Sequence, residues 1–201
     1  VAQSRGWVRR VGLGAAFGMA LATKISAFPL LLTVYAADQV QGETLSSRSL
    51  IPIRKFLRTL CTLAVTITVF IFTQPYALID WRTFLDHTLR EAQIARGILE
   101  VPYTLQYSGT WPFLYSMWQT ALWGLGLPVG LMAWAGLAAL LVRWLRYGRW
   151  TDTLPLTWAG PTFLIIGLLH TRYLRYMLPL TPILCVAAVQ LLETLKDRAR
   201  R

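Results

Sequence analysis

The sequence predicts an all-α protein, a polytopic bundle of transmembrane helices with an amphipathic surface helix in a long external loop. Three observations support this fold class. The chain of 201 residues is 55% hydrophobic and only 14% charged, whereas soluble domains carry about 25% charged residues. Long apolar runs alternate with short polar connections. The Lys and Arg residues behind the net charge of +11 lie mainly in those connections, a placement typical of topology signals and not of a nucleic-acid-binding patch.

The first apolar run covers residues 11–37 and contains one charged side chain, Lys24. A single helix would hold this lysine near the bilayer centre, which costs about 2.5–3.5 kcal/mol. Two short helices, about 11–23 and 26–37, avoid that cost by meeting at a polar turn, and we favour them. One tilted helix whose Lys24 side chain snorkels to the surface is the alternative. The first helix also carries a face of small residues suited to close packing, namely Gly12, Gly14 and Gly18.

Four later apolar runs complete the predicted bundle. They cover about 56–72, 119–142, 153–169 and 177–192. Pro128 is expected to kink the second of them, because proline removes a backbone hydrogen bond and clashes with the preceding turn. The whole chain is predicted to be a single transmembrane domain, 1–201.

A long polar block, residues 73–118, lies between the apolar runs 56–72 and 119–142 and is predicted to be an external loop. Its stretch 83–97 has apolar residues on one side and charged residues near another, as in helices that lie on a membrane surface. Asp86 and Glu91 are interpreted as partners of Arg90 and Arg82 on a solvated face, and a role as acid or base groups is the alternative. His87 has no nucleophile beside it in the sequence.

The positions of Lys and Arg give one consistent orientation. The predicted cytoplasmic segments are 1–10, 38–55, 143–152 and 193–201. The Lys24 turn, the 73–118 loop and the turn at 170–175 then share the opposite face. This alternation requires the chain to reverse at Lys24.

The turn at 170–176 places two arginines on the face that the positive-inside rule disfavours. Charges kept against that bias suggest an anionic partner, and arginine forks match the geometry of phosphate. Arg172 and Arg175 would share one face if the segment were helical, with Tyr173 and Tyr176 at the level of the headgroups. An interfacial anchor that holds ordinary lipid headgroups is the simpler alternative. No metal ligands have a recognisable spacing, so no cofactor is assigned, although a divalent cation stays possible.

Several stretches of the sequence resemble one family of membrane enzymes. They are GMALATKISA at 18–27, TQPY at 73–76, IARG at 94–97, PYT at 102–104 and RYLRYMLPL at 172–180. These are similar to the later half of bacterial GT-C-type glycosyltransferases, the family of the dolichyl-phosphate-mannose protein mannosyltransferases and the aminoarabinose lipid A transferase. The resemblance covers nearly the whole chain.

The resemblance implies transfer of a hexosyl or pentosyl group from a polyprenyl-phosphate donor to a protein or lipid acceptor. The reaction would take place on the non-cytoplasmic face of a bacterial plasma membrane. By similarity, the donor phosphate would be bound by Lys24, Arg172, Arg175 and Tyr176, and further substrate contacts would come from Tyr103, Tyr107 and Arg96. The family's catalytic acidic residue lies in a first external loop that no part of this chain matches. The chain is therefore expected to be the C-terminal portion of a longer enzyme and inactive alone.

Two other classes of function fit the sequence. Half of a transporter would explain a broken helix with a charge at its break, although no internal repeat is visible. A non-enzymatic membrane scaffold would need no common site for the predicted external segments.

Overall fold

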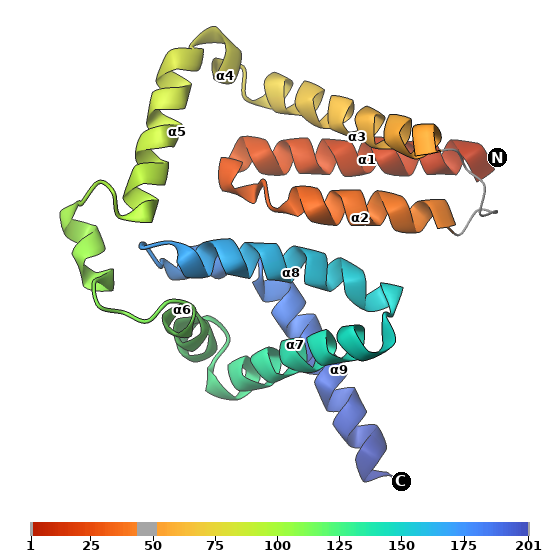
Figure 1. Ribbon diagram of the computed structural model, residues 1–201, viewed down its shortest axis with the longest axis vertical. Coiled ribbons are helices and arrows are strands. Elements are labelled where there is room, and N and C mark those ends of the chain that lie inside the picture. The colour runs from red at the N-terminus through yellow and green to blue at the C-terminus, as the bar shows by residue number, and fades with distance from the viewer. Residues whose placement is uncertain (1, 44–51, 201) are drawn as a thin grey trace. The chain divides into compact units, whose positions relative to one another are not determined.

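The computed structural model describes residues 2–43 and 52–200, most of which are helical and none of which forms a strand (Figure 1). The predicted all-α class is confirmed for this part of the chain. The chain divides into two compact units, Val1–His87 and Thr88–Arg201. The division falls inside helix α5 (Trp81–Arg96). Each unit has its own packing and is described separately.

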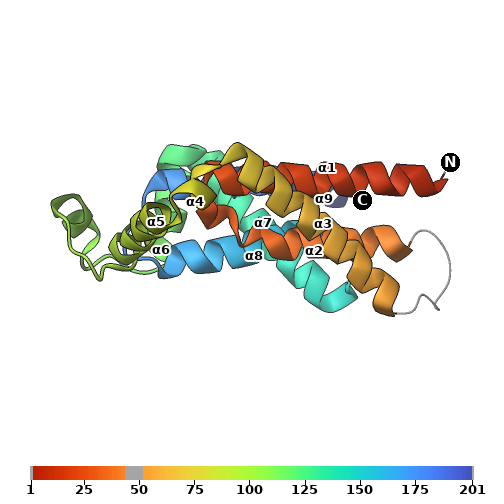
Figure 2. The same ribbon diagram turned by 90° about the horizontal axis from the view of Figure 1, so that it is seen from above.

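The first unit is built from three helices that lie side by side (Figures 1 and 2): α1 (Ala2–Thr23), α2 (Leu30–Glu43) and α3 (Pro52–Thr73). Glycines let α1 approach α3 closely. A Cβ added to Gly14 would lie 2.7 Å from the carbonyl oxygen of Thr62, and one added to Gly18 would lie 2.6 Å from that of Thr66. The Thr66 hydroxyl also donates a hydrogen bond to the carbonyl oxygen of Gly14, at 3.1 Å. Of the small residues expected to form a packing face, Gly14 and Gly18 therefore pack against α3, whereas Gly12 does not, because nothing lies within 4 Å of its added Cβ.

The chain reverses at Lys24, as predicted. Helix α1 ends at Thr23, Lys24 is extended with φ −156° and ψ 110°, and a short 3₁₀ turn η1 (Ile25–Ala27) follows. Helix α2 then begins at Leu30, directly after Pro29, whose fixed φ suits the start of a helix. Two helices are confirmed, and the single continuous helix is excluded. The Lys24 side chain is exposed at the turn.

Substitution at these glycines tests the contact between α1 and α3. We expect Gly18→Ala to lower the free energy of unfolding by about 1–3 kcal/mol, because the added methyl group meets a backbone carbonyl that cannot move aside. Gly12→Ala is the matched control in the same helix, since nothing lies within 4 Å of its added Cβ. It should be neutral or slightly stabilising. Equilibrium unfolding in mixed micelles measures the stability of both variants. An equal loss of unfolding free energy in Gly18→Ala and Gly12→Ala would contradict the packing of α1 on α3.

Helix α5 follows the short helix α4 (Tyr76–Ile79). The carboxylate of Asp80 accepts a hydrogen bond from the backbone N–H of Thr83 at 3.3 Å, which satisfies one free donor at the start of α5. The helix ends at Arg96, and Gly97, which follows it with φ +75°, terminates it. The predicted amphipathic helix over 83–97 is thus confirmed as a helix, two residues longer at its start. Its apolar residues Leu85 and Leu89 are exposed.

The second unit packs α7 (Leu127–Tyr147), α8 (Trp150–Leu168) and α9 (Thr181–Ala199) together (Figure 1). The shorter elements are η2 (Pro102–Tyr107), α6 (Leu114–Gln119), the π-helical turn η3 (Thr120–Gly124) and η4 (Leu174–Met177). The core of this unit is formed by Ala133, Ala159, Ile166, Met177, Leu180, Leu184 and Ala188. An added Cβ at Gly136 of α7 would lie 2.2 Å from the Ala187 carbonyl oxygen of α9, so these two helices also pack through small residues.

The predicted run 119–142 is two elements and not one kinked helix. The chain turns at Gly126, which has φ +79°, and α7 begins at the next residue. Pro128 therefore lies in the first turn of α7, where its missing N–H has no partner to lose. The expected kink at Pro128 is wrong for this reason.

Helix α7 is the one described helix that is long and apolar enough to cross a bilayer, with 21 residues and a mean hydropathy of 1.5. The stretch Thr59–Thr73 is apolar but shorter. A bilayer-spanning role for the remaining helices stays a prediction.

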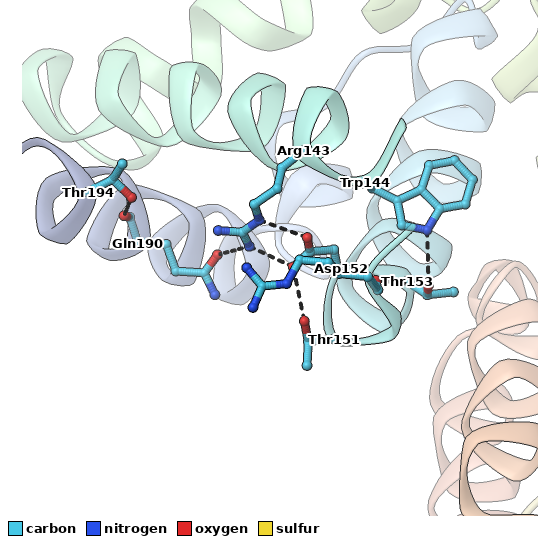
Figure 3. A network of polar contacts seen from close by, with 8 residues as sticks. Arg143, Trp144, Thr151, Asp152, Thr153, Gln190 and Thr194 are labelled. Atoms are coloured by element: carbon cyan, nitrogen blue, oxygen red, sulfur yellow. Dashed lines mark hydrogen bonds and ion pairs between the residues drawn. The ribbon is translucent and has the colours of Figure 1, made fainter. Parts of the chain in front are cut away.

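A polar network joins the three long helices of the second unit (Figure 3). Arg143 on α7 donates to both carboxylate oxygens of Asp152 on α8, at 2.7 and 2.6 Å, and to the side-chain oxygen of Gln190 on α9, at 3.2 Å. Beside it, the indole N–H of Trp144 donates to the Thr153 hydroxyl at 3.0 Å. Asp152 is only 2% exposed. Its charge is compensated by a two-pronged arginine contact, the strongest geometry for such a pair.

Removing one partner of the Arg143–Asp152 ion pair should lower the free energy of unfolding more than replacing both partners with apolar residues. We expect Asp152→Ala to destabilise the protein by roughly 2–3 kcal/mol, below the 3–5 kcal/mol of a fully buried pair, because the Arg143 side chain is 32% exposed. The apolar pair Arg143→Met with Asp152→Leu should recover most of that loss. Unfolding in mixed micelles tests both variants, and a double variant less stable than Asp152→Ala would argue against this account.

Candidate functional site

The segment 170–177 carries the two predicted phosphate-binding arginines, and it is fixed at its start by the end of α5. The backbone N–H groups of His170 and Thr171 donate to the carbonyl oxygen of Ala95, at 2.9 and 3.2 Å. Gly97 lies against the His170 ring so closely that an added Cβ would be 2.8 Å from it. Thr171 is fully buried. The contact therefore satisfies a carbonyl at the last turn of α5 and holds the start of the segment.

The other end of the segment is fixed by the apolar core. Met177 and Leu180 are buried among residues of α7, α8 and α9. The short 3₁₀ turn η4 leads into Met177, so its side chains are carried on a rigid turn. Residues 172–176 are thus held on both sides, which is the condition for a preorganised binding site.

Arg172 is buried, with 8% of its surface exposed. Its Nη1 donates to the Thr110 carbonyl oxygen at 2.9 Å and also contacts the Thr110 hydroxyl. Its Nε is buried and has no hydrogen-bond partner among the residues that the structure describes. Burial lowers the pKa of Arg172, and the neighbouring Tyr115 acts in the opposite direction. An arginine stays protonated in proteins all the same, so a positive charge with a free donor is held inside the unit.

Arg175 lies against aromatic rings. Its guanidinium carbon is 4.4 Å from the centre of the Tyr173 ring and 5.8 Å from that of Tyr176. The guanidinium is exposed. A cation over an aromatic face is held by the ring quadrupole, so Arg175 is presented to solvent in a defined position.

Four tyrosines pack edge to face beside the two arginines, and we call them the tyrosine cluster: Tyr107, Tyr115, Tyr173 and Tyr176. The ring centres of Tyr107 and Tyr173 are 5.5 Å apart, those of Tyr173 and Tyr176 are 5.4 Å apart, and those of Tyr107 and Tyr115 are 5.9 Å apart. These are favourable T-shaped geometries. The cluster joins η2, α6 and the 170–177 segment around the arginines.

The tyrosine cluster adds no negative charge to the site, because the pKa values of two of its phenols are raised. Burial raises the pKa of Tyr107, and the neighbouring tyrosines raise it further. Burial also raises the pKa of Tyr173, with Tyr103 as the next contributor. Both side chains therefore remain neutral phenols at pH 7, and the two arginines set the sign of the site.

The loop that carries Thr110 is anchored by a strained residue. Phe113 has φ +62°, an uncommon conformation for an aromatic residue, and the Leu114 N–H bonds to the Pro112 carbonyl oxygen at 2.6 Å. The Phe113 ring packs on Phe163 with centres 5.5 Å apart. It also fills the space beside Gly167, where an added Cβ would lie 2.1 Å from the ring. The absence of a side chain at Gly167 thus lets the loop reach Arg172.

The structure brings several predicted site residues together. Arg172, Arg175, Tyr107 and Tyr176 belong to this site, and Tyr103 is exposed beside Tyr173. Arg96 is exposed at the last turn of α5, next to the residue that binds the 170–171 backbone. Lys24 belongs to the first unit, so its share in this site stays a prediction.

One expectation about the arginines is wrong. Arg172 and Arg175 do not share a helical face, because η4 begins only at Leu174 and Arg172 precedes it in an extended segment. Arg172 points into the unit and Arg175 is exposed. Sequence reasoning also missed Thr110 and Tyr115, which are distant in the chain from their partners and stand in no motif.

The chemistry available to this site is anion binding. Within residues 2–43 and 52–200, neither Arg172 nor Arg175 is paired with a carboxylate. In the same described part, no group of three His, Cys, Asp or Glu residues could hold a metal ion. Two arginine forks and phenol hydroxyls are suited to the oxygen atoms of a phosphate.

Comparison of the chain with protein-family profiles, with curated proteins and with solved structures finds no match in any of the three. The assignment of a function therefore depends on the site and on the sequence motifs alone.

The role of Gly167 can be tested against a control in the same helix. We expect Gly167→Ala to displace the Phe113 ring, lower the unfolding free energy by about 1–3 kcal/mol, and change the near-UV circular dichroism of the aromatic residues. Gly160→Ala has open space around its added Cβ and should leave the spectrum unchanged. Unaltered spectra for both variants would show that Phe113 does not hold the loop.

Proposed function

We propose that the chain is part of a membrane glycosyltransferase that uses a polyprenyl-phosphate-linked sugar, and that the second unit supplies the binding site for the donor phosphate. The observation that carries this proposal is the buried Arg172, whose Nε has no partner in the described part of the chain, together with an Arg175 held on the face of Tyr173. The motifs at 18–27 and 172–180, which resemble those of GT-C-type transferases, agree with it.

The energetic argument concerns charge compensation. A charge that is buried without a counter-ion costs several kcal/mol. Among residues 2–43 and 52–200, the neutral Thr110 is the one hydrogen-bond partner of Arg172, so a bound anion would supply the missing charge compensation. A phosphate group can accept hydrogen bonds from two guanidinium groups at once.

The two arginines would have different parts in the reaction. Arg175, which is exposed, would meet the donor phosphate directly, with the hydroxyl of Tyr176 next to it. Arg172 would supply fixed positive charge from within the unit, and Lys24 would be a third cation. In the transfer, an acceptor oxygen bonds to the anomeric carbon, the bond from that carbon to the phosphate oxygen breaks, and the phosphate leaves with the electron pair. Cations that stabilise the developing charge lower this barrier.

The acceptor must lose a proton to a base during this step. By resemblance, that base is an acidic residue in an external loop which this chain does not match.

Substitutions in the complete enzyme test the proposal. We expect Arg175→Ala and Lys24→Ala each to lower kcat for sugar transfer by about 100-fold, the scale of losing one group that stabilises the transition state. Arg146→Ala removes an exposed arginine from the last turn of α7 and is the control, expected to stay within about twofold. The assay follows labelled sugar from a polyprenyl-phosphate donor in proteoliposomes, with thermal unfolding as the check on folding. Full transfer by both variants would rule out the phosphate-binding role.

Half of a transporter is a second candidate, favoured by the break between α1 and α2 that carries Lys24. Solute flux in the same proteoliposomes, without any sugar transfer, would select it over the transferase.

A further inference from the structure

Three tryptophans around α6 are exposed although they lie in an uncharged stretch of the chain. Trp111 is 75% exposed, Trp118 is 52% exposed and Trp123 is 72% exposed, and Leu114 between them is exposed as well. Leu114 and Trp118 are four residues apart on α6 and so share a face. The π-helical turn η3 that follows keeps Trp123 on broadly the same side. We call Leu114, Trp118 and Trp123, together with the exposed Trp111 in the loop just before α6, the tryptophan face.

We propose that the tryptophan face docks into the headgroup layer of the lipid bilayer, at the non-cytoplasmic surface. This inference is independent of the glycosyl transfer proposed above, because it concerns only where the second unit meets the membrane.

The first argument is the chemistry of the stretch. Residues 101–142 contain no Asp, Glu, Lys, Arg or His, whereas about a quarter of the residues in a soluble domain are charged. An exposed apolar patch of this kind marks a binding surface. A partner recognised through ion pairs would find no counter-charge here. The indole ring, with its apolar body and one N–H donor, is enriched at the boundary between lipid tails and water.

The second argument is the position of the patch relative to α7. The π-helical turn η3 ends at Gly124, and α7, the candidate membrane span, begins at Leu127. At 1.5 Å per residue, a helix of this length is about 30 Å long and matches the hydrocarbon thickness of a bilayer. Both ends of α7 must then lie near a boundary of the hydrocarbon layer. The end next to the tryptophan face is the one remote from Arg143 and Arg146, which mark the cytoplasmic side.

The third argument is that the patch is fixed to α7 and is not on a loose loop. An added Cβ at Gly130, in the first turns of α7, would lie 2.3 Å from the Cα of Ala121. Ala121 and Thr120 of η3 are buried. The turn that leads from Trp118 to Trp123 therefore packs directly on the start of α7, and the depth of α7 sets the depth of the tryptophans.

This arrangement gives α6 two different faces. Tyr115 contacts Tyr107 in the tyrosine cluster, and Ser116 is buried, while Leu114 and Trp118 face outward. If the outward face lies among the headgroups, the tyrosine cluster and its two arginines lie behind it at about the same depth. A lipid-borne ligand could then reach Arg175 without leaving the bilayer surface.

Fluorescence quenching tests the proposal directly. The protein is reconstituted in phosphatidylcholine vesicles that contain either a headgroup nitroxide lipid or a lipid with a nitroxide in the middle of the acyl chain. The triple variant Trp111→Phe, Trp118→Phe and Trp123→Phe is compared with Trp134→Phe, whose ring is half-buried against Phe163. All four substitutions keep an aromatic ring, so the variants should fold.

We expect the fluorescence quenched by the headgroup nitroxide to fall at least twofold in the triple variant and to change little in Trp134→Phe. Three results would overturn the proposal. The emission that the triple variant lacks could be quenched by acrylamide dissolved in the water but not by the nitroxide lipids, which places the three tryptophans in solvent. It could be quenched mainly by the mid-chain nitroxide, which places them in the hydrocarbon. It could be protected from all quenchers at high protein-to-lipid ratio only, which places a second copy of the chain on the face.

Discussion

The hydrogen bonds from Arg172 to Thr110 are the interaction on which the site of the second unit depends. They join the loop after η2 to the segment before η4, two parts of the chain that are 62 positions apart. They also explain why a charged side chain can be buried at all. The guanidinium contacts two oxygens of one threonine, and its buried Nε has no hydrogen-bond partner within residues 2–43 and 52–200. The hydrogen bonds of the buried guanidinium are therefore incomplete, and a buried polar group with incomplete hydrogen bonds calls for an explanation such as a bound ligand.

The surrounding packing serves to keep this interaction in place. Ala95 at the end of α5 accepts two backbone hydrogen bonds from the 170–171 segment, and Met177 and Leu180 hold the other end in the core. Phe113 takes an unfavourable backbone conformation so that its ring can fill the space beside Gly167. Backbone strain of this kind costs about 1–3 kcal/mol and persists only where neighbouring contacts determine it. Its occurrence three residues from Thr110 is consistent with a functional loop.

Charge is distributed differently at the two ends of the second unit. At one end, Arg143 is neutralised by Asp152 and joined to Gln190, so that it stabilises the contact of three helices. At the other end, Arg172 and Arg175 contact threonine and tyrosine and no described carboxylate. The same residue type is thus structural in one place and available for binding in the other. The difference lies in the partner that the fold supplies, because an arginine with a carboxylate has little capacity left for a phosphate.

The sequence by itself determined the all-helical class, the break at Lys24 and the helix over most of 83–97, because these depend on local features. Apolar runs, one charged residue within such a run, and amphipathic spacing each act over a few turns of chain. It also pointed to Arg172 and Arg175 through their type and their place in the charge pattern. Only the tertiary structure decided that one is buried and the other exposed, that Thr110 and Tyr115 join them, and that α7 begins at Leu127, after the turn at Gly126, with Pro128 in its first turn. These outcomes depend on which distant segments pack together, and no local spacing encodes that choice.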